Sequence, residues 1–93
     1  MKSTDVLDAY LWDLRAHAES KLRCLTRVQQ MVNDYGRKNA DARGDLRTKI
    51  LADLTDVVTI TMTMSTISRQ ALDAALALDA SESRSRVEAT RQR

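Results

Sequence analysis

The sequence predicts an all-α fold: an antiparallel two-helix hairpin, completed by self-association or by a partner protein into a helical bundle. Three observations lead to this prediction. Aromatic residues make up only 3% of the chain, and a core of Leu, Val, Ile, Met and Ala is typical of helix bundles. The chain has two Gly and no Pro, whereas an all-β chain needs turn residues about every 8 to 12 positions. Apolar residues recur at spacings of three and four, which is the helical period.

A first helix is predicted over residues 4–35. Ser3 or Thr4 can cap its start, and Asp5 and Asp8 stand where the helix dipole favours carboxylates. Its main apolar column, interrupted by Lys21, consists of Leu7, Leu11, Leu14, Ala18, Leu25, Val28, Val32 and Tyr35. A second column, repeating every seven residues beside the first, consists of Tyr10, His17, Cys24 and Met31. Such a face is too broad for a single partner helix.

The polar stretch "GRKNADARG", residues 36–44, is predicted to be the loop. Gly36 suits the position after a helix end, where a positive φ is favoured. Asp45, or Asp41 if the helix begins earlier, can cap the second helix. A connection this short makes the two helices antiparallel.

A second helix is predicted over residues 45–80. Its apolar column, with Asp53 as a discordant member, consists of Leu46, Ile50, Val57, Ile60, Met64, Ile67, Ala71, Ala74 and Leu78. The stretch "VVTITMTMSTIS", residues 57–68, also alternates as a half-buried strand would. Helix is the better interpretation because the chain offers no second strand, and a lone strand leaves its backbone groups unpaired.

The second helix is apolar on more than one side. Off its main column lie Leu51, Leu54, Val58, Met62, Leu72 and Leu76. One antiparallel helix cannot cover all of these residues, so a second copy or a different protein must pack on them. The hairpin is assigned to residues 1–80, and the Arg-containing stretch 81–93 is expected to be a flexible or frayed tail.

Charge and cysteine content restrict the functional class. The net charge is +2, and residues 81–93 hold four Arg and two Glu, so the rest of the chain sums to zero. This balance, without aromatic residues in the tail, argues against a nucleic-acid partner. The single cysteine excludes an internal disulfide and favours a cytoplasmic location. The longest uncharged run has 12 residues, short of the roughly 20 of a membrane span, and the N-terminus does not read as a signal peptide.

No catalytic, cofactor-binding or metal-binding residues are predicted. Asp13, His17 and Cys24 share a helical face, but successive turns spread them over about 16 Å, whereas metal ligands must converge. No nucleophile, second base or Gly-rich loop accompanies the Asp–His pair, so we expect no enzyme activity. Lys21 and Asp53, polar at apolar positions, are interpreted either as devices that set helix register or as ordinary residues at the rim of the interface.

The layout resembles the small two-helix co-chaperones of bacterial type III secretion. The resemblance covers residues 5–78 and rests on "YLWDLRAHAESKLRCL" in an amphipathic first helix, on the polar loop between Gly36 and Gly44, and on the apolar second helix. It implies a cytoplasmic protein that pairs with a larger helical-repeat chaperone and keeps the needle subunit unpolymerised.

The sequence therefore predicts a protein-interaction module, a small cytoplasmic chaperone or adaptor that docks a helical partner or secretion substrate on its second helix. The predicted protein-binding residues are Val57, Val58, Ile60, Met62, Met64 and Ile67. The alternative is a homodimeric four-helix bundle with a regulatory role, contacting nucleic acid through its Arg-containing tail.

Overall fold

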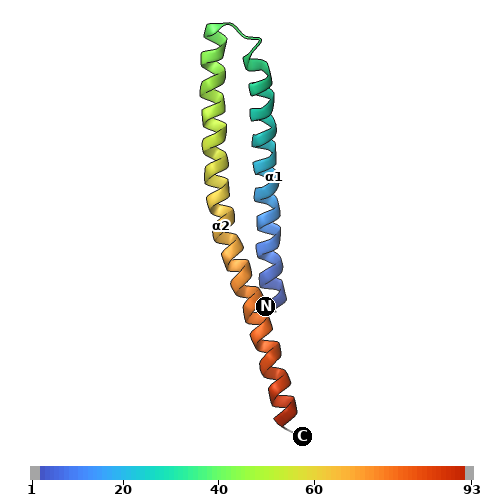
Figure 1. Cartoon of the computed structure of the whole chain (residues 1–93). Helices are drawn as coiled ribbons and strands as arrows, with labels where there is room; N and C mark the ends of the chain where they lie inside the picture. The colour runs from blue at the N-terminus through green and yellow to red at the C-terminus, as the bar shows by residue number, and fades with distance from the viewer. Residues whose placement is uncertain (1–2, 92–93) are drawn as a thin grey trace.

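The computed structural model describes residues 3–91 and consists of two antiparallel helices (Figure 1). Helix α1 spans Ser3–Tyr35, and helix α2 spans Ala40–Arg91. The all-α hairpin predicted from the sequence is confirmed, and the part of the chain that is described contains no strand. Residues 57–68 lie within α2, so the alternating stretch is helical.

The loop is shorter than predicted, because α2 begins at Ala40 and not near residue 45. The Ala42 N–H donates to the side-chain oxygen of Asn39 at 2.9 Å, which is the bond that an N-cap residue makes. Asn39 therefore caps α2, and the prediction of Asp41 or Asp45 in this role is wrong. Gly44, predicted to close the loop, lies inside α2.

The end of α1 is satisfied by loop N–H groups, which bond to the Asp34 and Tyr35 carbonyls, and by a side chain from α2, without a left-handed glycine. Gly36 does not have a positive φ, so that prediction is also wrong. Arg43 Nε donates to the Tyr35 carbonyl at 3.1 Å, and Arg43 Nη2 donates to the Gly36 carbonyl at 3.4 Å. These bonds satisfy carbonyls that have no partner within α1, and they place a cation at the negative end of its dipole.

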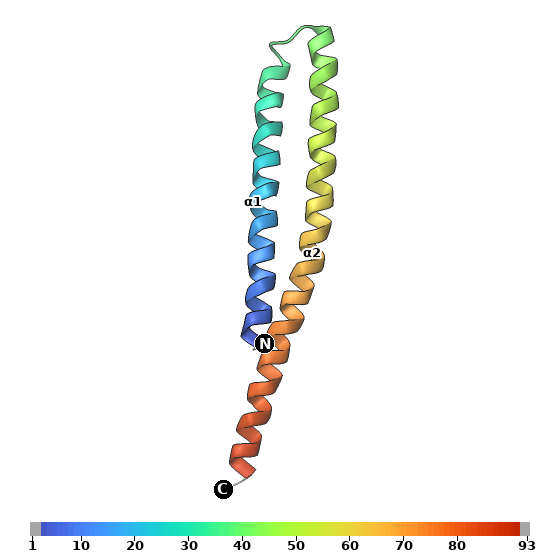
Figure 2. The same ribbon diagram turned by 180° about the vertical axis from the view of Figure 1, so that it is seen from behind.

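Helix α2 continues past the N-terminal end of α1, as Figures 1 and 2 show. Its 52 residues rise about 78 Å, against about 50 Å for the 33 residues of α1. The helix does not end near residue 80 as predicted: residues 81–91 are helical, and 92 and 93 lie outside the described residues. This segment has no Gly or Pro to stop it, and Glu82 and Arg86 approach to 3.8 Å one turn apart.

The seam between the helices is a single column of buried and half-buried residues from each. On α2 it is the predicted column together with Asp53. On α1 the prediction is half right, because every second member of the main column lies in the seam together with the second column. The α1 seam consists of Leu7, Tyr10, Leu14, His17, Lys21, Cys24, Val28, Met31 and Tyr35. Leu11, Ala18, Leu25 and Val32 are exposed, because one partner helix can cover only one of two adjacent columns.

Candidate interaction surface

Beside the seam, the hairpin has an exposed apolar face to which both helices contribute. We define the apolar face as Leu11, Leu22, Leu25 and Val32 of α1 with Leu51, Leu54, Val58 and Leu72 of α2. Each of these residues directly follows a seam residue in the sequence. Three further exposed apolar residues, Trp12, Met62 and Leu76, lie at its outer edges, further around each helix.

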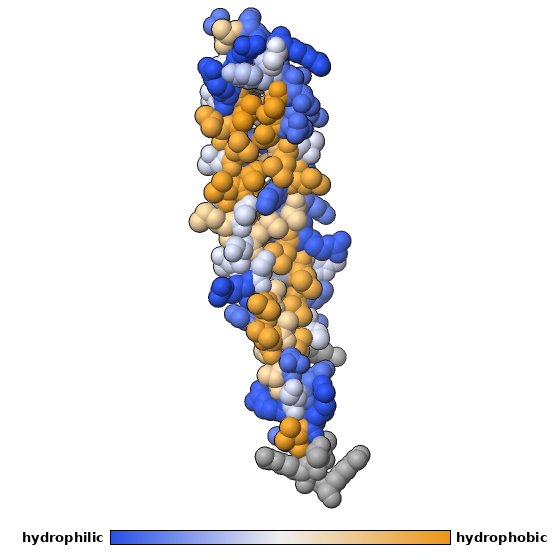
Figure 3. All heavy atoms as spheres, in the orientation of Figure 1, coloured by the Kyte–Doolittle hydropathy of each residue, from blue (hydrophilic) through white to orange (hydrophobic). Residues whose placement is uncertain are grey.

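Helix geometry explains why the two sets share one side of the hairpin. Each residue turns about 100° around the helix axis from the one before it, since 3.6 residues make a turn. In an antiparallel pair whose seams face each other, the residues that follow the seam therefore point to the same side. In Figure 3 apolar atoms gather over both helices on one face, most densely in the half nearer the loop.

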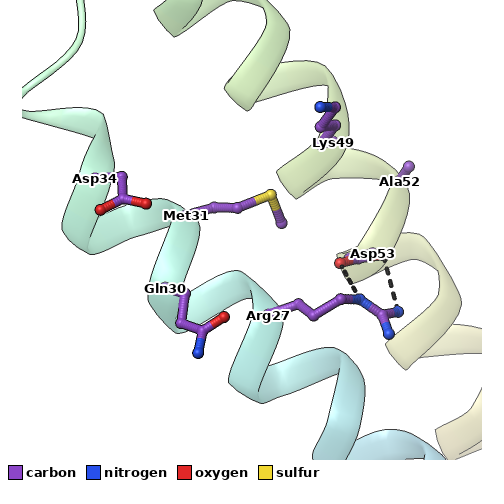
Figure 4. A pocket seen from close by; sticks show the side chains of 7 residues that line it. All are labelled: Arg27, Gln30, Met31, Asp34, Lys49, Ala52 and Asp53. Atoms are coloured by element: carbon purple, nitrogen blue, oxygen red, sulfur yellow. Dashed lines mark hydrogen bonds and ion pairs between the residues drawn. The ribbon is translucent and has the colours of Figure 1, made fainter.

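The opposite side of the hairpin, the polar flank, is formed by residues that directly precede the seam. Arg27, Asp34, Lys49, Asp56 and Thr63 stand there, all of them exposed. In its loop-proximal part, side chains of both helices line an open pocket (Figure 4). Since large apolar residues are concentrated on the other side, a protein partner desolvates fewer charges when it packs on the apolar face than on the polar flank.

An ion pair joins the two helices at the polar flank. Arg27 Nε lies 3.1 Å from Asp53 Oδ2, and Arg27 Nη2 lies 3.3 Å from Asp53 Oδ1, so the contact is bidentate (Figure 4). The hydrogen bond to Asp53 and the charge of its carboxylate raise the pKa of Arg27. Arg27 Nη2 also donates to the buried sulfur of Cys24 at 3.3 Å. Asp53, the discordant member of the α2 column, thus has a partner on α1.

The threonine hydroxyls of α2 are satisfied within the helix, so they add little polarity to the surface that a partner would contact. Six threonine hydroxyls along the helix each donate to the backbone carbonyl four residues earlier. The donors are Thr48, Thr55, Thr59, Thr61, Thr63 and Thr66. A donor satisfied in this way does not need water or a partner, and the methyl group remains available for packing. The stretch 57–68 therefore presents a largely apolar circumference in spite of its four threonines.

The structure divides the predicted binding residues between two surfaces. Ile67 is buried in the seam, and Val57, Ile60 and Met64 are half-buried there against α1. Val58 and Met62 are 58% and 67% exposed and remain available to a partner. Sequence reasoning missed the α1 half of the apolar face, although the two adjacent apolar columns of that helix were the signal for it.

The Asp13, His17 and Cys24 set does not form one cluster. His17 Nδ1 lies 2.8 Å from the Asp13 carbonyl oxygen and 3.2 Å from its carboxylate. Cys24 is buried and bonds to Arg27 instead. Among the described residues, no three His, Cys, Asp or Glu side chains are placed to hold a metal ion.

One 18-residue stretch of helix α2 has a mean hydropathy of 1.3. By length and composition, α2 could therefore cross a membrane. Its charge-free part, residues 57–68, is bounded by Asp56 and Arg69. As a helix this part is about 18 Å long, against about 30 Å for the hydrocarbon core of a bilayer. Four of its six apolar residues, Val57, Ile60, Met64 and Ile67, already lie in the seam with α1.

Comparison with known proteins finds no family model that matches the chain, and no similar curated protein or solved structure.

Proposed function

We propose that this chain is a non-enzymatic protein-interaction module, a small adaptor or chaperone that binds another helical surface through its apolar face. The observation that supports this proposal is a set of eight exposed large apolar side chains on one side of a hairpin, six of them in the half nearer the loop. Soluble proteins rarely leave such a set in water, and a set of this kind marks an interaction site.

The form of the apolar face favours a helical partner. It is two helices wide and follows both of them lengthwise, so it offers grooves into which the ridges of further helices can pack. An amphipathic helix or helix pair with apolar residues at spacings of three and four would fill it. The satisfied threonine hydroxyls at its border remove the desolvation cost that free hydroxyls would add.

The proposal assigns the seam and the apolar face different roles. Met64 and Ile67 hold the hairpin together, whereas Val58 and Leu54 hold the partner. The prediction that a partner packs on α2 is kept for Val58 and Met62, and it is extended to α1 through Leu25.

The test is affinity capture from the native organism with the tagged full-length chain. Val58→Asp and Leu54→Asp should each lose the captured protein, because a charge would be buried in the interface. Thr63→Asp is the matched control, since it adds the same charge to the polar flank of α2. Circular dichroism should show the same helix content in all three variants. A protein retained by both face variants and lost in the control would refute the proposal.

A further inference from the structure

We infer that the apolar face is covered by a second copy of this chain, stacked antiparallel face to face to give a four-helix bundle with twofold symmetry. The inference rests on the proposed function and names its partner. Three independent features support it: the surface that the hairpin leaves exposed, the positions of the apolar residues along it, and the distribution of charge between its two ends.

The single hairpin exposes far more surface than a compact protein of its mass. Its accessible surface is 7432 Å², against about 5,400 Å² for a compact 10.5 kDa chain. Among the residues whose burial the structure describes, 4–88, the buried hydrophobic core consists of Cys24, Ile67 and Ala71. A stable interface removes about 800 Å² from each partner, and the excess of about 2,000 Å² provides more than that.

The apolar positions are compatible with one twofold axis for both helices. Arg27 of α1 and Asp53 of α2 are in contact, so they lie at the same height along the hairpin. Because the helices are antiparallel, other pairs whose residue numbers sum to 80 are also level, and Ala18 lies beside residue 62. An axis through Ala18 brings Leu11 against Leu25 of the second copy. Residue 62 is also near the midpoint between Leu51 and Leu72 of α2. The same axis therefore brings Leu51 of one copy against Leu72 of the other. These four leucines thus meet in large pairs and the small Ala18 meets itself at the centre, while Val58 and Leu54 lie opposite Ser65 and Arg69.

The charge distribution selects the antiparallel arrangement. The loop half, residues 19–61, holds eight Lys and Arg and six Asp and Glu, for a net charge of +2. The open half, residues 3–18 with 62–91, holds five Arg and seven Asp and Glu, for a net charge of −2. Antiparallel stacking sets each loop half on the open half of the other copy. A parallel stack would also cover the apolar face, but it would bring halves of like charge together.

The antiparallel stack makes a specific pair at its rim. Arg47 and Asp79 are both exposed and both directly follow a seam residue, so they border the apolar face at its two ends. Under the same twofold axis, Arg47 of one copy lies within one helical turn of Asp79 of the other. Symmetry repeats this pair at the opposite end of the interface.

The first measurement is the mass of the purified full-length chain by light scattering in reducing buffer. The expected mass is twice the chain mass of 10.5 kDa, and it should fall to that of one chain in the Leu25→Asp, Val58→Asp double variant. A folded single chain in the wild type would overturn the second copy as the occupant, yet a protein captured through the same face would preserve the proposed function. A dimer unaffected by the double variant would overturn both.

Because the double variant could simply unfold, charge reversal provides a second measurement. Arg47→Glu alone should weaken the dimer about tenfold, since symmetry removes two rim pairs. Adding Asp79→Arg should restore the wild-type dissociation constant. If the doubly reversed variant keeps its helix content but still dimerises more weakly than the wild type, the predicted pairing is wrong.

Disulfide trapping determines the orientation, in a Cys24→Ala background with one new cysteine per chain. A mixture of Leu51→Cys and Leu72→Cys chains should form the mixed disulfide, because bonded cysteines need Cα atoms within about 7 Å. Copies of Leu51→Cys alone should not, because their residues 51 lie about 32 Å apart along the axis. A mixed disulfide between Leu51→Cys and Val32→Cys would indicate the parallel stack and overturn the inference. Flotation of a single chain with phosphatidylcholine–phosphatidylglycerol vesicles would overturn it in favour of a lipid surface.

Discussion

Replacing Ile67 by alanine tests which face of α2 holds the hairpin together. Ile67 is 6% exposed and lies in the seam. The substitution removes three carbon atoms, each contributing about 0.8 kcal/mol of transfer free energy, so the transfer loss is about 2.4 kcal/mol. The cavity that remains adds to this cost. We therefore expect the free energy of unfolding to fall by about 3 kcal/mol, a large share of the 5 to 15 kcal/mol of a typical domain.

The assay is equilibrium unfolding in urea, followed by far-ultraviolet circular dichroism at one fixed protein concentration. With a denaturant slope of about 1.5 kcal/mol per molar, the midpoint should fall by about 2 M. Thr59→Ala is the control on the same helix. Thr59 is exposed and bonds only within its own helix, to the Thr55 carbonyl at 3.2 Å. Alanine is the better helix former, so this change should stabilise by about 0.5 kcal/mol.

The two substitutions are thus expected to have opposite signs. A loss below about 1 kcal/mol for Ile67→Ala would show that this residue does not pack in the seam. The assignment of the apolar face would then fail with it, because the face is defined by its position next to the seam. A change in the denaturant slope would point instead to a different unfolding reaction.

Four further outcomes follow from single contacts. Gly44→Ala should stabilise the chain by about 0.5 to 1 kcal/mol in thermal unfolding, because Gly44 is helical without a positive φ and a Cβ there meets nothing closer than 3.9 Å. Asn39→Ala should destabilise by about 1 kcal/mol through loss of the cap, whereas Asn39→Asp should not. A thiol reagent should modify Cys24, 6% exposed, far more slowly than a cysteine that replaces Thr63, exposed on the polar flank, in a Cys24→Ala chain. Raising the pH from neutral to about 10 should leave the Arg27 ion pair intact, because a guanidinium stays charged over that range at its ordinary pKa and Asp53 raises the pKa of Arg27 further.

The helical seam of α2 could be predicted because its spacing of three and four persists from Leu46 to Leu78. The strand-like alternation at residues 57–68 did not mislead, because a strand needs a pairing partner that the chain lacks. The structure adds the reason that a run rich in β-branched residues is tolerated in a helix. Hydroxyls such as that of Thr61 bond to the helix's own carbonyls, 2.7 Å away in this case.

The ends of the helices could not be predicted from local patterns. Gly36 and Asp41 are common capping residues at suitable positions, but the ends are satisfied otherwise. Arg43 reaches back across the loop to the last carbonyls of α1, a contact that depends on where α2 starts. Loop N–H groups of Arg37 and Lys38 also bond to the carbonyls of Asp34 and Tyr35, so the end of α1 is satisfied without a left-handed Gly36, and Asn39 caps α2.

Four residues predicted for the α1 seam, Leu11, Ala18, Leu25 and Val32, lie outside it, and this has a physical explanation. Leu11 and Leu25 repeat every seven residues as regularly as Tyr10 and Cys24 do, so periodicity alone cannot rank the two columns. Apolar residues occur at every surface that is buried in the functional assembly, including surfaces between chains. In a single hairpin, only one helix, α2, is available to cover α1. In the antiparallel dimer both columns of α1 are covered, one by α2 and one by the second copy. The exposed residues that sequence analysis placed in the seam are then residues of the dimer interface. The mass of the purified chain tests both the dimer and this explanation.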